Sequence, residues 1–139
     1  MSVTTAAGNR IDPSPRTALL AAGDLSAILL FVAVGEYTHG YNPLVDVGRV
    51  AGTAIPFVVG WLLVAVAAGL YAGTASASPG RTLGVTMGAW TLAVGIAQAL
   101  RATSLFHGNA AVAFALVSVG IGGAAVCGWR LVATLTLGT

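Results

Sequence analysis

The sequence predicts an all-α fold, an integral membrane four-helix bundle whose spans run up-down-up-down. Hydrophobic residues make up 57% of the 139-residue chain and charged residues only 7%, where a soluble domain carries about 25% charged residues. The mean hydropathy of +0.91 agrees with a chain whose solvent is lipid. Four apolar stretches have the length of about 20 residues that a bilayer requires. Short links between them place neighbouring helices antiparallel.

The first span is expected over residues 17–39. It follows a polar stretch, residues 1–16, that we expect to be a disordered tail outside the membrane. The span is longer than the apolar core of a secretory signal peptide, and it contains Asp24. We therefore interpret it as an uncleaved span that opens a transmembrane domain covering residues 17–135.

The second span is expected over residues 53–73. Asn42 and Pro43 suit a helix start, so helical structure is expected to resume ahead of the span itself. Pro56 is expected to kink this helix, because proline lacks the N–H that a helix interior uses.

The third and fourth spans are expected over residues 80–101 and 110–131. Ser78 and Pro79 suit the cap and the first position of the third span. An even number of spans places both termini on one side of the membrane. That side holds four arginines, Arg10, Arg16, Arg81 and Arg130. The other side holds two, Arg49 and Arg101. Under the positive-inside rule this distribution predicts cytoplasmic termini.

Small residues form stripes along three spans, at the 3.5-residue period of a left-handed helix contact. The third-span stripe consists of Gly84, Gly88, Thr91, Gly95 and Gln98. The fourth span carries Ala113, Val117, Gly120, Ala124 and Cys127, and the second carries Trp61, Ala65, Ala68 and Ala72. Because small residues let helices approach closely in lipid, we interpret these stripes as packing contacts within the bundle. A homo-oligomer contact and a functional groove are the alternatives.

The third-span stripe gives a specific expectation. It should face another helix and not lipid, and Gln98 should find a hydrogen-bond partner there. Leucine at Gly88 or Gly95 is then expected to separate two helices. Leucine at Ala93 or Ala97, which are expected to lie off the stripe, should do much less.

Charged residues at membrane depth each need a partner, a water-filled cavity or a function, because burying an unpaired charge in lipid is costly. Asp24 and Arg130 are expected at similar depth near the terminal side, where they could form a buried ion pair. A second polar layer is expected near the opposite surface, and it consists of Glu36, His39, Gln98 and Arg101. We interpret both layers as structural ion pairs, with a functional pocket or a proton path as the alternative.

No metal site or cofactor is expected. Glu36, His39 and His107 all lie toward the non-terminal side, but their spacing matches no metal-ligand motif, so we expect solvated interfacial histidines. Cys127 is the single cysteine and is expected to be a small core residue.

The aromatic residues divide by depth. Tyr37, Tyr41 and Trp129 fall near the expected membrane interfaces, where aromatic belts lie. Trp61 and Trp90 fall deeper, and we interpret them as packing residues. The lining of a small-molecule pocket is their alternative role.

Short motifs in all four spans resemble one known family. They are Gly23-Asp24, Pro56-Phe57, Gly60-Trp61, Ala99-Leu100-Arg101 and Gly128-Trp129-Arg130. The chain is similar, over about residues 17–131, to the family catalogued as domain of unknown function 3054. The resemblance implies a small four-span membrane protein in the plasma membrane of a prokaryote, and it implies no activity and no catalytic residue.

Two functions from different classes follow from these patterns. The favoured one is a non-enzymatic bundle that lies in the lipid bilayer and packs with itself or with another membrane protein. The alternative is a small transporter or channel for a proton, an ion or a hydrophobic compound, with Asp24 or Glu36 as the titrating site. A companion Arg130 would keep Asp24 charged and so oppose proton exchange. An enzyme is not expected because the polar residues form no catalytic constellation. Nucleic acid is not expected either, since the net charge is only +2.

Overall fold

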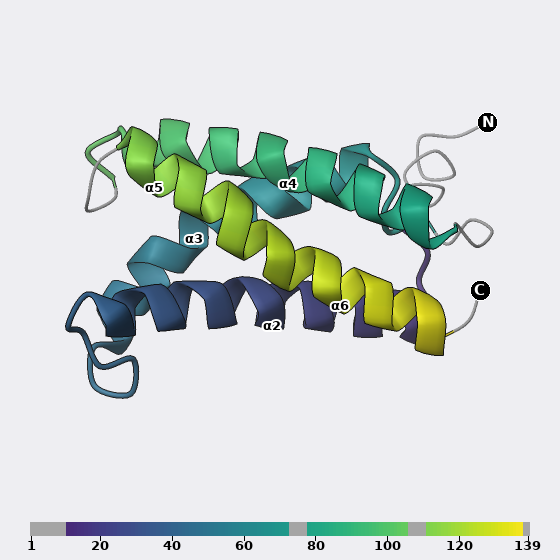
Figure 1. Ribbon diagram of the computed structural model, residues 1–139, viewed down its shortest axis with the longest axis horizontal. Coiled ribbons are helices and arrows are strands. Elements are labelled where there is room, and N and C mark those ends of the chain that lie inside the picture. The colour runs from purple at the N-terminus through teal and green to yellow at the C-terminus, as the bar shows by residue number, and fades with distance from the viewer. Residues whose placement is uncertain (1–10, 73–77, 106–110, 138–139) are drawn as a thin grey trace.

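A computed structural model describes residues 11–72, 78–105 and 111–137, and these residues form helices and no strand (Figure 1). Three of the four spans are single helices, which are α2 (Pro15–Thr38), α3 (Val47–Ala67) and α4 (Pro79–Arg101). The fourth span is one continuous helical rod in three parts, α5 (Val112–Val117), a π-helical segment η1 (Ser118–Gly122) and α6 (Gly123–Thr136). Each of the four spans is long and apolar enough to cross a membrane.

The four spans alternate in direction. α2 begins at the end of the bundle where α6 finishes, and α3 finishes and α4 begins at this same end (Figure 1). We call it the terminal end, and we call the other the opposite end. α3 packs on α4, α4 on α6, α6 on α2 and α2 on α3, which closes the bundle. The predicted all-α membrane four-helix bundle is therefore confirmed.

Serine caps begin two of the helices as the sequence suggests. The Ser14 hydroxyl accepts a hydrogen bond from the Thr17 backbone N–H at 3.3 Å. The Ser78 hydroxyl accepts one from the Arg81 N–H at 3.2 Å. In both cases a proline follows the cap, where its missing N–H costs nothing. α2 thus begins at Pro15, within the segment 1–16 that was expected to be a tail. Residues 1–10 of that segment lie outside the described residues.

α3 lies closer to the N-terminus than the expected second span, 53–73. It begins at Val47, after a turn in which the Asp46 carboxylate accepts from the Asn42 N–H at 3.0 Å. It ends at Ala67 because the chain reverses at Gly69, whose φ of +78° favours glycine. The Leu70 N–H closes the turn by donating to the Ala65 carbonyl at 2.9 Å. This early end frees the residues after Ala67 to fold back over the bundle.

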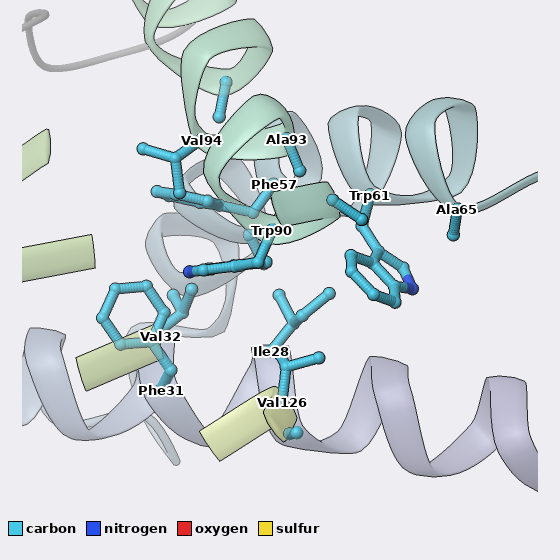
Figure 2. Packing of buried hydrophobic residues seen from close by; sticks show 14 of the residues in the cluster. Ile28, Phe31, Val32, Phe57, Trp61, Ala65, Trp90, Ala93, Val94 and Val126 are labelled. Atoms are coloured by element: carbon cyan, nitrogen blue, oxygen red, sulfur yellow. The ribbon is translucent and has the colours of Figure 1, made fainter. Parts of the chain in front are cut away.

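The centre of the bundle is a cluster of aromatic side chains (Figure 2). Phe57 of α3 stacks on Trp90 of α4 with ring centroids 5.8 Å apart, and Phe31 of α2 meets both rings edge-on. The ring centroids of Trp61 and Trp90 lie 6.3 Å apart. Each such pair adds about 0.5–1.5 kcal/mol to the free energy gained by burial. Trp61 and Trp90 are fully buried and pack against each other, so they fill the core as packing residues.

The third-span stripe does not face the bundle interior, and that expectation was wrong. Gly84, Gly88, Thr91 and Gly95 are exposed. A Cβ atom built on any of these three glycines would have open space within 4 Å, leaving aside the backbone of its own helix. The inward face of α4 instead consists of Ala89, Trp90, Ala93, Val94 and Ala97.

The reason lies in the contact between α3 and α4. A Cβ atom on Gly60 would lie 2.6 Å from the Ala93 carbonyl oxygen, so the missing side chain of Gly60 lets α4 approach α3. This contact turns Trp90, Ala93 and Ala97 inward. The two alanines lie off the stripe, as expected, but they are buried, which removes the basis for expecting leucine to be better tolerated there than at the glycines.

The stripes on the other spans divide in the same way. Of the second-span stripe, Trp61 and Ala65 on α3 are buried, whereas Ala68 and Ala72, which follow the end of α3, are exposed and half-buried. On the fourth span, the stripe is outward, with Ala113, Val117, Gly120 and Ala124 exposed and Cys127 half-buried. The close approach on this span uses Gly122 and Gly123 instead, because Cβ atoms there would meet Trp90 at 2.6 Å and Met87 at 2.8 Å.

Candidate functional site

The polar side chains inside the bundle gather in two clusters. The first lies toward the terminal end and joins three helices with the turn after α3. We call it the Asp24 cluster, and it consists of Asp24 on α2, Trp61 on α3, Tyr71 in the turn and Arg130 on α6.

Asp24 and Arg130 form a two-pronged ion pair. Arg130 Nε donates to Asp24 Oδ1 at 2.9 Å, and Arg130 Nη2 donates to Oδ2 at 2.6 Å. The Asp24 side chain is fully buried and that of Arg130 is only 7% exposed. The pairing predicted from matched depth is therefore confirmed. A guanidinium fits a carboxylate in this geometry and fixes both side chains in orientation.

Two further groups complete the cluster. The Tyr71 hydroxyl donates a hydrogen bond to Asp24 Oδ2, and Trp61 Nε1 donates to the Tyr71 oxygen at 2.9 Å. Arg130 Nη1 donates to the Leu70 carbonyl at 3.3 Å. Burial raises the pKa of the Tyr71 hydroxyl, and the neighbouring Asp24 charge raises it further. The Asp24 cluster thus holds a neutral tyrosine hydroxyl against a carboxylate whose two oxygens both accept hydrogen bonds.

The residues next to the ion pair interlock as well. A Cβ atom on Gly23 would lie 1.9 Å from Cε2 of Trp129, so the indole occupies the space of a missing side chain. Trp129 Nε1 donates to the Leu20 carbonyl at 3.2 Å. Trp129 is therefore a half-buried contact between α2 and α6. Gly23-Asp24 on α2 and Trp129-Arg130 on α6 therefore form one continuous contact between the two helices.

The second cluster lies at the opposite end of the bundle. We call it the Glu36 cluster, and it consists of Glu36, Arg49 and Thr53, which hydrogen bonds join, and of Arg101, a buried residue at the end of α4. Arg49 Nε donates to Glu36 Oε2 at 2.9 Å, and the Thr53 hydroxyl donates to Oε1 at 2.7 Å. Glu36 is buried, whereas the Arg49 side chain is 40% exposed. This cluster reaches the surface, unlike the Asp24 cluster.

Arg101 was the expected partner of Glu36 or His39. It is 8% exposed, and its guanidinium lies over the Phe114 ring at 4.4 Å. Glu36 and Arg49 both act electrostatically on it. The ion pair that the structure shows for Glu36 is with Arg49, and a direct Glu36–Arg101 contact stays a prediction.

The other two residues of the predicted layer lie apart from the ion pair. His39 is exposed, and its Nδ1 lies 2.8 Å from the Gly35 carbonyl oxygen. Gln98 Nε2 donates to the Ala111 carbonyl at 3.0 Å, which gives Gln98 the predicted partner.

Sequence reasoning missed Arg49, Thr53 and Tyr71 as cluster members. Arg49 and Thr53 lie one turn apart in the first part of α3, on the side of the membrane where Glu36 ends the preceding helix. That shared end was the available signal for them. Nothing in the sequence singles out Tyr71, which reaches Asp24 only because α3 ends early. Among the described residues no group of three potential metal ligands comes together, and His107 lies outside them.

The fold and these two internal clusters define a helical membrane protein of four spans. The chain belongs to the family described as Protein of unknown function (DUF3054), which it matches over residues 21–133. No curated protein and no solved structure matches it. Three of the motifs that carried the resemblance include helix-contact points in the structure, namely Gly23-Asp24, Gly60-Trp61 and, in Gly128-Trp129-Arg130, the last two residues.

Proposed function

We propose that this protein is a non-enzymatic membrane bundle that works by assembling with a second copy of itself. Assembly would use the outward surface of α4 and the fourth span. The observation that carries the proposal is the outward orientation of the small-residue stripes on these two helices. Helices in lipid associate through such residues, since lipid removes the hydrophobic drive that operates in water.

The interior of the bundle supports an assembly role over a transport role at Asp24. Both Asp24 oxygens accept from the buried Arg130, and one of them also accepts from Tyr71. Because these contacts occupy both carboxylate oxygens, Asp24 serves to join helices and leaves neither oxygen for a transported ion. The aromatic cluster of Phe57, Trp61 and Trp90 occupies the centre at full burial.

The two outward stripes border the same helix contact. Cys127 Sγ of the fourth-span stripe lies 4.0 Å from Met87 Sδ on α4. Gln98 of the third-span stripe donates to the Ala111 carbonyl just before α5. The stripes therefore flank the junction of α4 with the fourth span and make one surface of small residues, which we call the glycine surface. Its exposed members are Gly84, Gly88, Thr91, Gly95, Ala113, Val117, Gly120 and Ala124.

The test is the oligomeric state of two leucine variants. Gly88→Leu and Gly95→Leu are expected to convert an assembled protein to a monomer, because leucine would hold the partner backbone away. Their thermal unfolding as monomers should stay close to that of the wild type, since both positions open outward. Cross-linking in membranes and mass measurement in mild detergent give the readout.

The matched control is Ala22→Leu, at a small residue of α2 that is also exposed and that lies away from the glycine surface. It should leave the assembly intact. A wild-type protein that cross-links only as a monomer in membranes would overturn the proposal, as would full assembly of both glycine variants.

A transporter that uses Glu36 is the second candidate, because Glu36 is the acid whose partner reaches the surface. Its partner Arg49 has 40% of its side-chain surface exposed to solvent. Proton-linked flux across liposomes containing the purified protein is then expected, and Glu36→Gln should abolish it. Equal flux in the variant and in the wild type would exclude this role.

A further inference from the structure

We propose that the Glu36 cluster binds a phosphate group of the kind that phospholipid headgroups and free phosphate share. Arg101 and Arg49 would hold it. The inference does not depend on the proposed self-assembly, because it concerns a different part of the molecule.

Charge within the cluster favours an anion. Arg101 is 92% removed from solvent by the bundle, since 8% of its surface remains exposed. Among the described residues, the charged side chains that influence it are the Glu36 carboxylate and the Arg49 guanidinium. Glu36 already accepts hydrogen bonds from Arg49 and from Thr53. Asp46 at this end accepts the Asn42 N–H in the connection before α3. A second anion near Arg101 would balance the second guanidinium.

Two polar atoms unpaired within the described part of the chain, one in the Glu36 cluster and one on the preceding turn of α4, point to a ligand. Arg101 Nε is buried without a hydrogen-bond partner among the described residues, and so is Gln98 Oε1 one helical turn earlier. A buried donor left without a partner is costly, so a bound group that satisfies it gains affinity. Phosphate oxygens suit a guanidinium because they accept two parallel hydrogen bonds from it. A hydroxyl on the same headgroup would be a donor for Gln98 Oε1.

The position of the cluster matches the depth of lipid phosphates. Glu36 and Arg101 lie in the last turns of α2 and α4, and Arg49 lies in the first turn of α3. Arg49 lies 3.8 Å from the centroid of the Tyr41 ring. Tyr41 in turn lines a surface hollow of about 470 Å³, together with Tyr37, Thr38, Gly40 and Asn42. Tyrosines and arginines at a membrane interface are the side chains that contact headgroups, and basic pockets between spans bind anionic ones.

The experiment compares micelles that contain the full-length protein. Micelles of dodecyl maltoside, which contain no phosphate, are compared with dodecyl maltoside micelles that also contain phosphatidylglycerol, and the thermal midpoint of unfolding is measured in each. Phosphatidylglycerol is expected to raise the midpoint, because a ligand that binds only the folded state stabilises it. Adding inorganic phosphate to the dodecyl maltoside micelles without lipid, against sodium chloride at equal ionic strength, distinguishes the two sources. A rise with lipid alone assigns the site to a headgroup, and a rise with both assigns it to any phosphate.

Three variants connect the effect to the cluster. Arg101→Gln and Arg49→Gln should each weaken phosphatidylglycerol retention, measured by native mass spectrometry, by about tenfold or more. Glu36→Gln should strengthen it, because removing the competing carboxylate frees both arginines. A purely structural role for Glu36 predicts no such gain. Arg81→Gln, at an exposed arginine in the first turn of α4, is the matched control and should leave retention unchanged.

Arg49→Gln keeps the test decisive if Arg101→Gln does not fold, since Arg49 is the more exposed of the two. Two outcomes would overturn the proposal. One is a wild-type midpoint that responds neither to phosphatidylglycerol nor to phosphate. The other is unchanged lipid retention in Arg49→Gln together with unchanged retention in Glu36→Gln, which would mean that ordered water satisfies Arg101 and Gln98.

Discussion

At the scale of single residues, the Asp24–Arg130 pair shows how a chain keeps charges inside an apolar bundle. Removing an acid and a base from water costs several kcal/mol for each ion, and their mutual attraction recovers this only in good geometry with added hydrogen bonds. Here Arg130 meets both carboxylate oxygens, and Tyr71 and Leu70 take up remaining hydrogen-bonding capacity. The pair therefore fixes how α2, α6 and the turn after α3 fit together.

Breaking this pair on one side is expected to destabilise the protein severely. Asp24→Ala should lower the free energy of unfolding by about 3–5 kcal/mol, because it leaves Arg130 buried and unpaired. The double variant Asp24→Leu/Arg130→Met should recover a large part of this loss, since it removes both charges. Thermal unfolding in detergent provides the measurement, and Asp46→Asn on the outer connection is the control. A double variant as unstable as Asp24→Ala would contradict this account.

Tyr71 gives a second prediction, which concerns alkaline pH. Its pKa is raised by burial and by the Asp24 charge, so the folded protein keeps the hydroxyl proton at pH values where the unfolded chain loses it. The stabilisation is then fully present below the unfolded pKa of about 10 and is lost as the pH rises above it. Above that pH, the thermal midpoint of unfolding should decrease with rising pH in the wild type, and it should decrease much less in Tyr71→Phe. Parallel pH profiles for the two proteins would refute it.

At the scale of helices, the sequence predicts which residues share a face but not which face turns inward. α4 carries two candidate faces, the outward glycine stripe and the inward set around Trp90. Both faces repeat with the same helical period and both are apolar or small. In water, the contrast between polar and apolar residues would decide between them, but lipid removes this contrast. The decisive contact is Gly60 against the Ala93 carbonyl, which is specified by α3 and so is absent from the pattern of α4 itself.

Glycine substitutions separate the two faces experimentally. Gly60→Ala should cost about 1–3 kcal/mol of stability, because its Cβ would lie 2.6 Å from a backbone oxygen that cannot easily move. Gly88→Ala should be neutral or stabilise the monomer by up to about 1 kcal/mol, because alanine favours helix and the site is open. Unfolding of both variants under conditions that keep the protein monomeric gives the comparison. The opposite order would restore the glycine stripe as an internal contact.

The fourth span has a feature that its sequence pattern did not predict. The π-helical turn over Ser118–Gly122 interrupts the α-helix where Trp90 Nε1 donates to the Ser118 carbonyl at 2.8 Å. The Ser118 hydroxyl bonds the Phe114 carbonyl at 2.7 Å, and Gly122 leaves room for the indole. The Ser118 carbonyl accepts from Trp90 of α4, so it is less available for the regular α-helical hydrogen bond within its own helix. Such an insertion depends on tertiary contacts and cannot be inferred from local propensity.

At the scale of the whole molecule, the two polar clusters lie near opposite ends of the bundle, and both include a residue of α2. The four spans and the ion pair joining Asp24 to Arg130 were predictable, since length, hydropathy and the alternation of direction determine the depth of each residue. Partners within one layer were harder to predict. Several residues share that depth, and the helix rotations that select among them come from packing. Arg49 taking the ion pair with Glu36 is the clearest case.

Orientation in the membrane is the property that these depths leave open, and the arginines provide a prediction. The described ends of the bundle, at Pro15 and Thr136, lie on one side (Figure 1). Arg16 and Arg81 are exposed on that side, whereas Arg130 is neutralised by Asp24 and should contribute little to topology. We expect both termini in the cytoplasm.

A fluorescent reporter fused after Thr139 should therefore be active when it folds in the cytoplasm, and alkaline phosphatase at the same position should be inactive. Replacing Arg16 and Arg81 together by glutamine should weaken this preference, because these two arginines are the exposed positive charges described on that side. Replacing Arg130 should not weaken it, provided that the variant still folds, since its charge is already paired inside the bundle. Active phosphatase after Thr139 in the wild-type protein would reverse the assignment. The Glu36 cluster would then face the cytoplasm.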